Sequence, residues 1–176
     1  MSVESDGLSA LQRVTRANPF IKSDLASRDL AAASHGWAEA GLTVRAVRGS
    51  KMRTEDQFFN EVSAALQFPY YFGENWPAFD ECLADLKWLP RGTGYVFVVY
   101  EADQVLADAP SQAFATFEKV IHRACDEFSE PVDDGESWDR PATPFHLVIQ
   151  LPGGVEGNWK RKPSSWQPAG LADADE

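Results

Sequence analysis

The sequence of 176 residues lacks long apolar runs, and no stretch approaches the roughly 20 residues that a membrane-spanning helix needs. Residues 1–14 have no basic start followed by an apolar stretch, so no secretory signal is predicted. Only two cysteines are present, Cys82 and Cys125. They could pair, but because nothing indicates export, two buried thiols in a reducing cytosol are favoured. These absences predict a cytoplasmic protein with no membrane partner.

Basic residues are also scarce. The chain has 16 lysines and arginines against 27 aspartates and glutamates, which gives a formal net charge of −11. Nucleic acid and anionic lipid would be repelled by such a charge, whereas a basic protein would be attracted. Acidity alone does not define a partner, because many proteins are acidic merely to stay dispersed.

Motifs of the common enzyme classes are missing. There is no Cys-x-x-Cys, no His-Glu-x-x-His and no Gly-rich phosphate loop. The residue types of a thiol nucleophile or a zinc site are present, as Cys82, Cys125, His35, His122 and His146. Cys82, however, lies on an apolar helical stripe, where a thiol is inert. We therefore expect no catalysis, no cofactor and no metal.

Three strands are predicted between residues 42 and 151. Leu42–Arg48 alternates and is rich in valine, and Gly49 then turns the chain. Tyr95–Tyr100 is apolar without alternation, as expected for a strand covered on both faces. Phe145–Leu151 is the last of the three.

Three helices separate these strands. Thr54 and Gln57 form a capping-box pattern that begins the first helix, which should stop near Phe68 because Pro69 follows. Asn75 is the predicted N-cap of the second helix, whose buried stripe consists of Phe79, Cys82, Leu83 and Leu86. The third helix carries apolar residues at helical spacing from Phe114 to Phe128.

Helical crossovers between strands imply parallel pairing, so the predicted fold class is α/β, with a small three-stranded parallel sheet packed with helices. Residues 1–41 are predicted to be a helical extension, in which Leu8–Thr15 and Leu25–Ala40 are broken by Asn18-Pro19 and Gly36. Asp126–Asp139, with seven acids and no base, is predicted to be a solvated loop. Residues 152–176 form a tail with little expected regular structure. The predicted division is therefore 1–41, 42–151 and 152–176.

Residues 71–83 combine an aromatic pair, a glycine, an asparagine, an alanine and a Cys-Leu pair at fixed offsets: Tyr71-Phe72-Gly73, Asn75-Trp76, Ala78-Phe79 and Cys82-Leu83. This segment resembles the hallmark of the barstar family of intracellular ribonuclease inhibitors, and the likeness covers roughly residues 42–151. The resemblance implies a barstar-like fold and an antitoxin or immunity role. Such a protein lays its helix and the preceding loop into the basic active site of a ribonuclease or ribonuclease toxin, with carboxylates in place of RNA phosphates.

The resemblance also implies contacts for individual residues. Tyr71 matches a contacting tyrosine of the loop, and Glu81 falls where the most important inhibitory aspartate lies. Pro77 stands where another contacting aspartate is found, and Asp80 stands where a tryptophan can make contact. Gly73, which allows a tight bend, and Asn75 are matched and are predicted to be structural. The predicted partner-binding residues are Tyr71, Trp76, Asp80, Glu81, Asp85 and Trp88.

Plainer interpretations stay open for these residues. Without the resemblance, Asp80, Glu81 and Asp85 fit a solvated helix face. Tyr71 and Trp76 fit core packing, and Trp88 fits either role. The loss of an aspartate at Pro77 and the added termini also leave a second hypothesis, in which the fold is an interaction module whose partner is not a nuclease.

Overall fold

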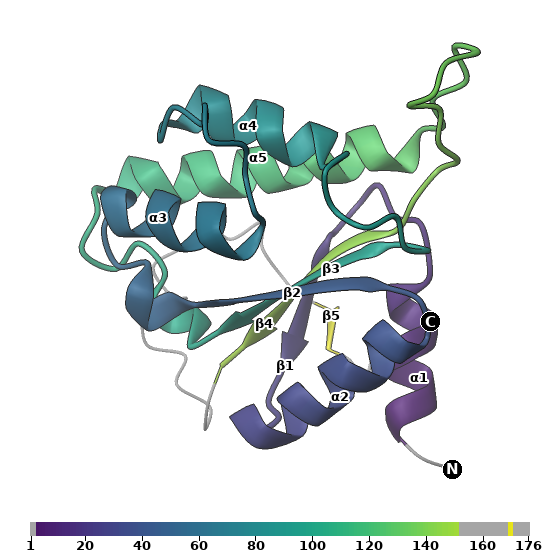
Figure 1. Ribbon diagram of the computed structural model, residues 1–176. Coiled ribbons are helices and arrows are strands. Elements are labelled where there is room, and N and C mark those ends of the chain that lie inside the picture. The colour runs from purple at the N-terminus through teal and green to yellow at the C-terminus, as the bar shows by residue number, and fades with distance from the viewer. Residues whose placement is uncertain (1–2, 152–168, 171–176) are drawn as a thin grey trace.

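A parallel sheet forms the centre of the protein in a computed structural model, which describes residues 3–151 and 169–170 (Figure 1). The strand order is β2-β3-β4-β1-β5, and every neighbouring pair is parallel. The strands are β1 (Phe20–Ser23), β2 (Thr43–Arg48), β3 (Tyr95–Tyr100), β4 (Phe145–Gln150) and the two-residue β5 (Ala169–Gly170).

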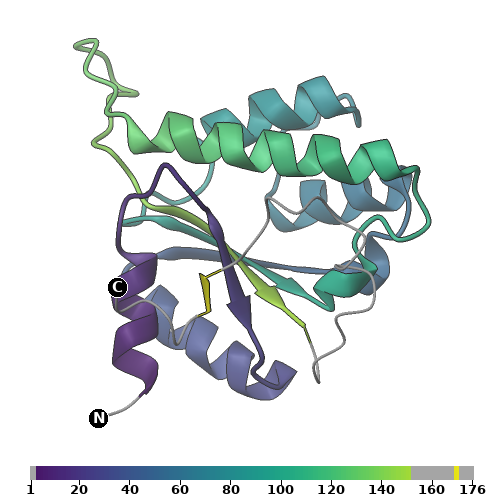
Figure 2. The ribbon, with the colours of Figure 1, turned by 180° about the vertical axis from the view of Figure 1, so that it is seen from behind.

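Helices cover both faces of this sheet. One face carries α3 (Glu55–Ala65), α4 (Trp76–Asp85) and α5 (Ser111–Ser129), and the other carries α1 (Val3–Leu11) and α2 (Ser27–Glu39) (Figures 1 and 2). Two short 3-10 helices, η1 (Gly49–Lys51) and η2 (Ala102–Gln104), follow β2 and β3. The architecture is therefore a three-layer α/β fold.

The prediction of a three-stranded sheet was wrong. β1 is a fourth strand, and it pairs with β4 in a register that places Phe20 opposite Leu147. With only four residues after Pro19, β1 is too short to display a periodic pattern in the sequence. Its partner β4 is more than 120 residues away in the sequence, since Phe20 pairs with Leu147, so no local signal could reveal the pairing.

Most other predicted elements are confirmed. The strands at Thr43–Arg48, Tyr95–Tyr100 and Phe145–Gln150 are present, and Thr54 and Gln57 form the capping box of α3. Some boundaries differ: α3 ends at Ala65, α2 runs through Gly36 without a break, and the first four residues of Asp126–Asp139 belong to α5. The predicted tail, apart from β5, lies outside the described residues.

The main core lies between the sheet and α3, α4 and α5. Its centre is Phe58, whose ring packs against Trp76, Phe79 and Phe117 with centroids 5.1–5.5 Å apart. Such aromatic pairs stabilise a core beyond the area that they bury. A smaller apolar cluster fills the opposite face; it consists of Leu11, Ile21, Leu30, Trp37, Leu42, Val96, Val98 and Val148.

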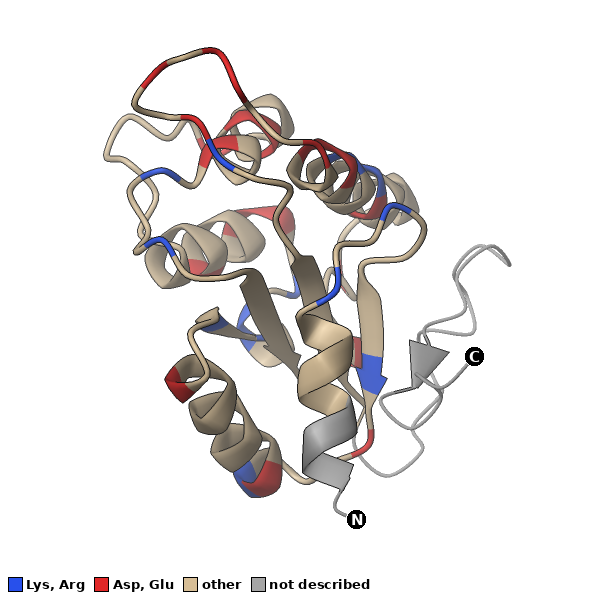
Figure 3. Ribbon diagram, turned by 90° about the vertical axis from the view of Figure 1, so that its right-hand side faces the viewer, with Lys and Arg blue, Asp and Glu red and all other residues tan. Residues whose placement is uncertain are grey.

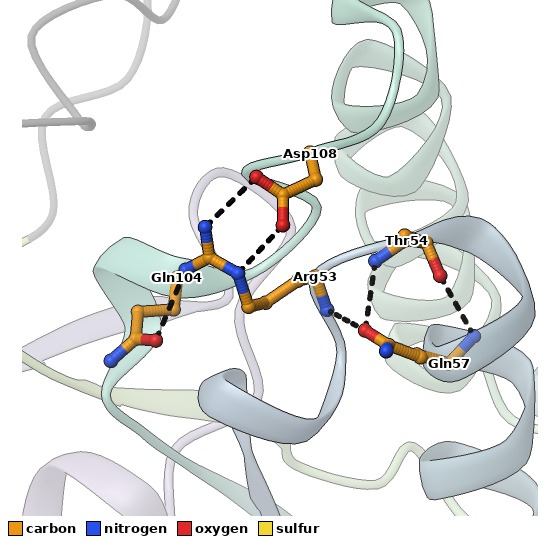
Figure 4. A network of polar contacts seen from close by, with 5 residues as sticks. All are labelled: Arg53, Thr54, Gln57, Gln104 and Asp108. Carbon is orange, nitrogen blue, oxygen red and sulfur yellow. Dashed lines mark hydrogen bonds and ion pairs between the residues drawn. The ribbon is translucent and has the colours of Figure 1, made fainter.

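A polar network fixes the start of α3 to the segment before α5 (Figure 4). Arg53 donates two hydrogen bonds to the carboxylate of Asp108, at 2.7 and 2.8 Å, and a third to Gln104. Its backbone N–H donates to Gln57 of the capping box. The bonds from Arg53 lower the pKa of Asp108, since they favour the charged carboxylate. The network therefore sets where α3 begins relative to α5.

Candidate functional site: α4 and its preceding loop

The start of α4 is defined by Asn75. Its side chain accepts a hydrogen bond from the Ala78 N–H at 2.9 Å, and Pro77 lies in the first turn, where a missing N–H costs nothing. The Asn75 amide also donates to the Gly73 carbonyl at 2.9 Å. A Cβ at Gly73 would lie 2.9 Å from that amide nitrogen, so any larger residue here would require the Asn75 side chain to shift.

The sharp bend before α4 falls on a different residue from the one expected. Glu74, with a φ of 48°, adopts a left-handed conformation, whereas the tight bend was expected at Gly73. Gly73 instead allows a close approach between its backbone and the Asn75 side chain.

The inner side of α4 is buried against the main core. Phe79, Leu83 and Leu86 belong to that core, and Cys82 lies beside them. Both Cys82 and Cys125 are free and buried, as expected. Burial raises the pKa of both thiols, that of Cys125 to about 11, so both remain protonated at neutral pH.

Two tryptophans flank the candidate site and are only half-exposed. The indole N–H of Trp76 donates to Glu55 at 3.1 Å, and the indole N–H of Trp88 donates to the Leu66 carbonyl at 2.9 Å. Both rings pack on the main core. Each tryptophan therefore has an internal partner for its polar group and a remaining edge at the surface.

The loop before α4 projects two tyrosines. Tyr71 has 69% of its surface exposed and Tyr70 is fully exposed, and their rings meet edge to face at 6.2 Å. Tyr70 was not among the predicted contacts, although the adjacent aromatic pair was a signal for it. Two exposed tyrosines supply rigid apolar area with a polar tip, which suits a protein interface.

The three predicted carboxylates of α4 differ in their partners. Asp80 pairs with Arg123 of α5 at 2.6 Å, and Asp85 pairs with Lys87 at 2.9 Å. Glu81 is exposed and has no ion-pair partner among the described residues. Successive helix residues are about 100° apart, so Glu81 lies between Asp80 and Asp85 around the axis. We call these five residues the α4 charge row; three carboxylates and two cations give it a formal charge of −1.

The partners in this row were missed by the sequence reasoning. Arg123 is 43 residues from Asp80 and comes from another helix, so no local pattern could join them. Lys87 follows the helix directly and was simply not considered. The site therefore extends from the tyrosine loop across α4 to α5.

The segment Asp126–Asp139, predicted to be a solvated acidic loop, carries most of its acidic residues after the end of α5 at Ser129. Acidic residues follow one another along this segment, which projects beyond the helices (Figure 3). Asp139 accepts hydrogen bonds from the Asp134 and Gly135 N–H groups at 3.0 and 2.9 Å. Arg91, which follows α4, donates to the Ser137 carbonyl at 3.1 Å and so connects the acidic loop to the α4 side.

The described residues contain neither a metal-binding cluster nor a membrane-spanning helix. Within residues 3–151 and 169–170, no group of three or more His, Cys, Asp or Glu side chains could hold a metal ion. Over the same residues, every helix is too short or too polar to cross a bilayer.

Fold and surface together define a parallel α/β domain that presents an aromatic loop and a charged helix on one side of its sheet. Residues 42–150 match a family model described as Barstar (barnase inhibitor). The match covers more than half of the chain, so this chain belongs to the barstar family, as the motif in residues 71–83 indicates. A comparison with the curated proteins finds no match. The matched region includes β2 through β4, whereas α1, β1 and α2 precede it.

Proposed function

We propose that this protein is an inhibitor that binds and occludes the basic active site of a microbial ribonuclease or ribonuclease toxin. The observation that carries the proposal is the match of residues 42–150 to a family described as barnase inhibitors. The net charge of −11 favours a basic protein as the partner and disfavours nucleic acid and anionic membranes. The protein acts in the cytoplasm, without a cofactor and without catalysis of its own, and it protects the cell that makes it.

The contact surface in this proposal consists of the tyrosine loop and α4. Glu81 occupies a phosphate position of the nuclease, because it is the exposed carboxylate of α4 without an ion-pair partner among the described residues. Tyr71 fills the groove beside it. Trp76, Trp88, Asp80 and Asp85 form the border of the contact. The Asn75 cap and the buried stripe hold these groups before binding, which reduces the entropy lost on association.

The direct test is titration of the purified full chain into a barnase-type ribonuclease while RNA cleavage is followed. We expect activity to be lost at a stoichiometry of one to one, with weaker binding at high salt. Glu81→Ala should weaken inhibition at least about tenfold, because a basic group of the nuclease would be left unpaired. Glu136→Ala is the matched control, since Glu136 is also an exposed glutamate but lies in the loop after α5. Equal effects of the two substitutions would place the contact elsewhere.

A second function is favoured by the pairing of Asp80 and Asp85 with cations and by Pro77, which together leave α4 little free negative charge. In that case the domain is an interaction module whose partner is not a nuclease. Affinity purification with wild-type chain and with Glu81→Ala separates the two functions. The inhibitor function requires a basic nuclease among the proteins that only the wild type retains.

A further inference from the structure

The guanidinium of Arg123, on α5, lies at the surface beside α4 and contacts Asp80. Its side chain is 67% exposed, whereas the Asp80 carboxylate that it contacts is only 21% exposed. Among the described residues its hydrogen bond goes from Nη1 to Asp80 Oδ2 at 2.6 Å. A guanidinium has five N–H donors, so most of them face outward. Asp80 therefore holds a cation in a fixed position at the edge of the proposed contact surface.

This cation changes what α4 offers to a basic partner. Arg123 engages Asp80, so that carboxylate is less available to a second cation. Arg123 also places a positive charge beside Asp80, the residue that precedes Glu81 on α4, at the edge of the surface that a basic active site would meet. Like charges brought together across an interface cost affinity and exclude partners. The −1 charge of the α4 charge row is small for a surface that must replace phosphates.

We propose that Arg123 determines which ribonucleases this surface accepts, by disfavouring an active site that is basic throughout and favouring one whose rim has mixed charge. The inference rests on the proposed inhibitor function and adds the property by which the ribonuclease is selected, which is the charge around its active site. Two effects of Arg123 both weaken binding to a basic partner: Arg123 repels incoming cations, and it occupies Asp80, which would otherwise pair with them.

The test compares four variants of the full chain with wild type as inhibitors of the same barnase-type ribonuclease at low salt. Arg123→Ala frees Asp80 and removes the cation, so inhibition should become about tenfold tighter, and Arg123→Glu should tighten it further. Arg123→Lys keeps the positive charge and should stay within about twofold of wild type. Arg28→Ala removes one exposed arginine from α2, on the opposite face of the sheet, and should also leave inhibition within about twofold. This control separates a local effect from the change in net charge.

The outcomes distinguish the two proposals. If wild type inhibits but Arg123→Ala and Arg123→Glu inhibit equally or less well, Arg123 is not a selectivity residue, and the inhibitor function stands. If Arg28→Ala tightens binding as much as Arg123→Ala, net charge is the cause and the inference is wrong. If no variant inhibits, Arg123→Glu included, both proposals fail for this class of nuclease. Thermal unfolding of each variant checks that the fold is retained.

Discussion

The two faces of the sheet are held to their helices by different kinds of contact. On the face under α3, α4 and α5, the core is large and rich in phenylalanine, and the rings of Phe58 and its neighbours fill the space between the helices. On the face under α1 and α2, the apolar cluster is smaller, and β4 contributes two buried polar side chains. Both of these point to the N-terminal segment.

The polar side chains are His146 and Gln150. His146 Nε2 lies 2.9 Å from the Arg13 carbonyl, just after α1. The Gln150 amide donates to the Leu25 carbonyl and the Ser27 hydroxyl, and its oxygen accepts from the Glu101 N–H. Buried polar groups of this kind stabilise only while every partner is in place. The polar contacts of the site-bearing layer, such as the one between Arg48 of β2 and Glu61 of α3, lie at the surface, and its buried contacts with the sheet are apolar. Attachment of the N-terminal layer also uses hydrogen bonds from polar side chains buried in β4.

Removal of core volume should have the largest effect. Phe58→Ala should lower the free energy of unfolding by about 3–5 kcal/mol, because it leaves a cavity among Trp76, Phe79 and Phe117. Urea denaturation followed by tryptophan fluorescence measures the loss. Tyr70→Ala is the control, since that ring is fully exposed. A similar loss from both would mean that the aromatic core does not hold the layer of α3, α4 and α5 together.

A polar change should have a smaller effect on the opposite face. Gln150→Leu keeps most of the volume but leaves the Leu25 carbonyl and the Glu101 N–H without their bonds, which should cost about 1–3 kcal/mol. Hydrogen exchange should rise first in α2 and only later in α4. Gln112→Leu, at an exposed position of α5, should change neither quantity. Uniform loss of protection in both layers would contradict the separate attachment of α2.

The pH dependence should come from the same face. Burial lowers the pKa of His146 below its ordinary value of 6.5. As pH falls below 6.5, the unfolded chain takes up a proton before the folded chain does, so stability is full above pH 6.5 and declines below it. One such group contributes a slope of at most about 1.4 kcal/mol per pH unit. Unfolding between pH 7.5 and 5.5 should show this slope in wild type and lose it in His146→Gln. His35→Gln, at an exposed position, should retain it.

The smallest expected effect is a gain. Gly36 lies inside α2 with no atom within 4 Å of the place where a Cβ would be. Gly36→Ala should therefore raise the free energy of unfolding by about 0.5–1 kcal/mol through the helix propensity of alanine. Thermal or urea unfolding measures it. Destabilisation by Gly36→Ala would show that a methyl group does not fit at this position of α2.

Local sequence patterns predicted much of the layer that carries the site. The Thr54–Gln57 capping box, the Asn75 cap and the apolar periods of α3, α4 and α5 involve residues three or four positions apart, so they can be seen along the chain. The motif at residues 71–83 indicated the barstar family for the same reason, and the family match confirms it. The predicted division at residues 41 and 151 and the predicted contact residues remain predictions.

What the sequence determined by itself was the family, the order of the central strands and helices, and the identity of the residues on α4. Only the tertiary structure decided that β1 joins the sheet beside β4, since the paired residues Phe20 and Leu147 are 127 positions apart in the sequence. The tertiary structure also decided that Arg123 meets Asp80 while Glu81 stays exposed. A charge on a helix can be read from the sequence, but its partner comes from another helix, and the charge that remains for binding depends on how the two helices pack.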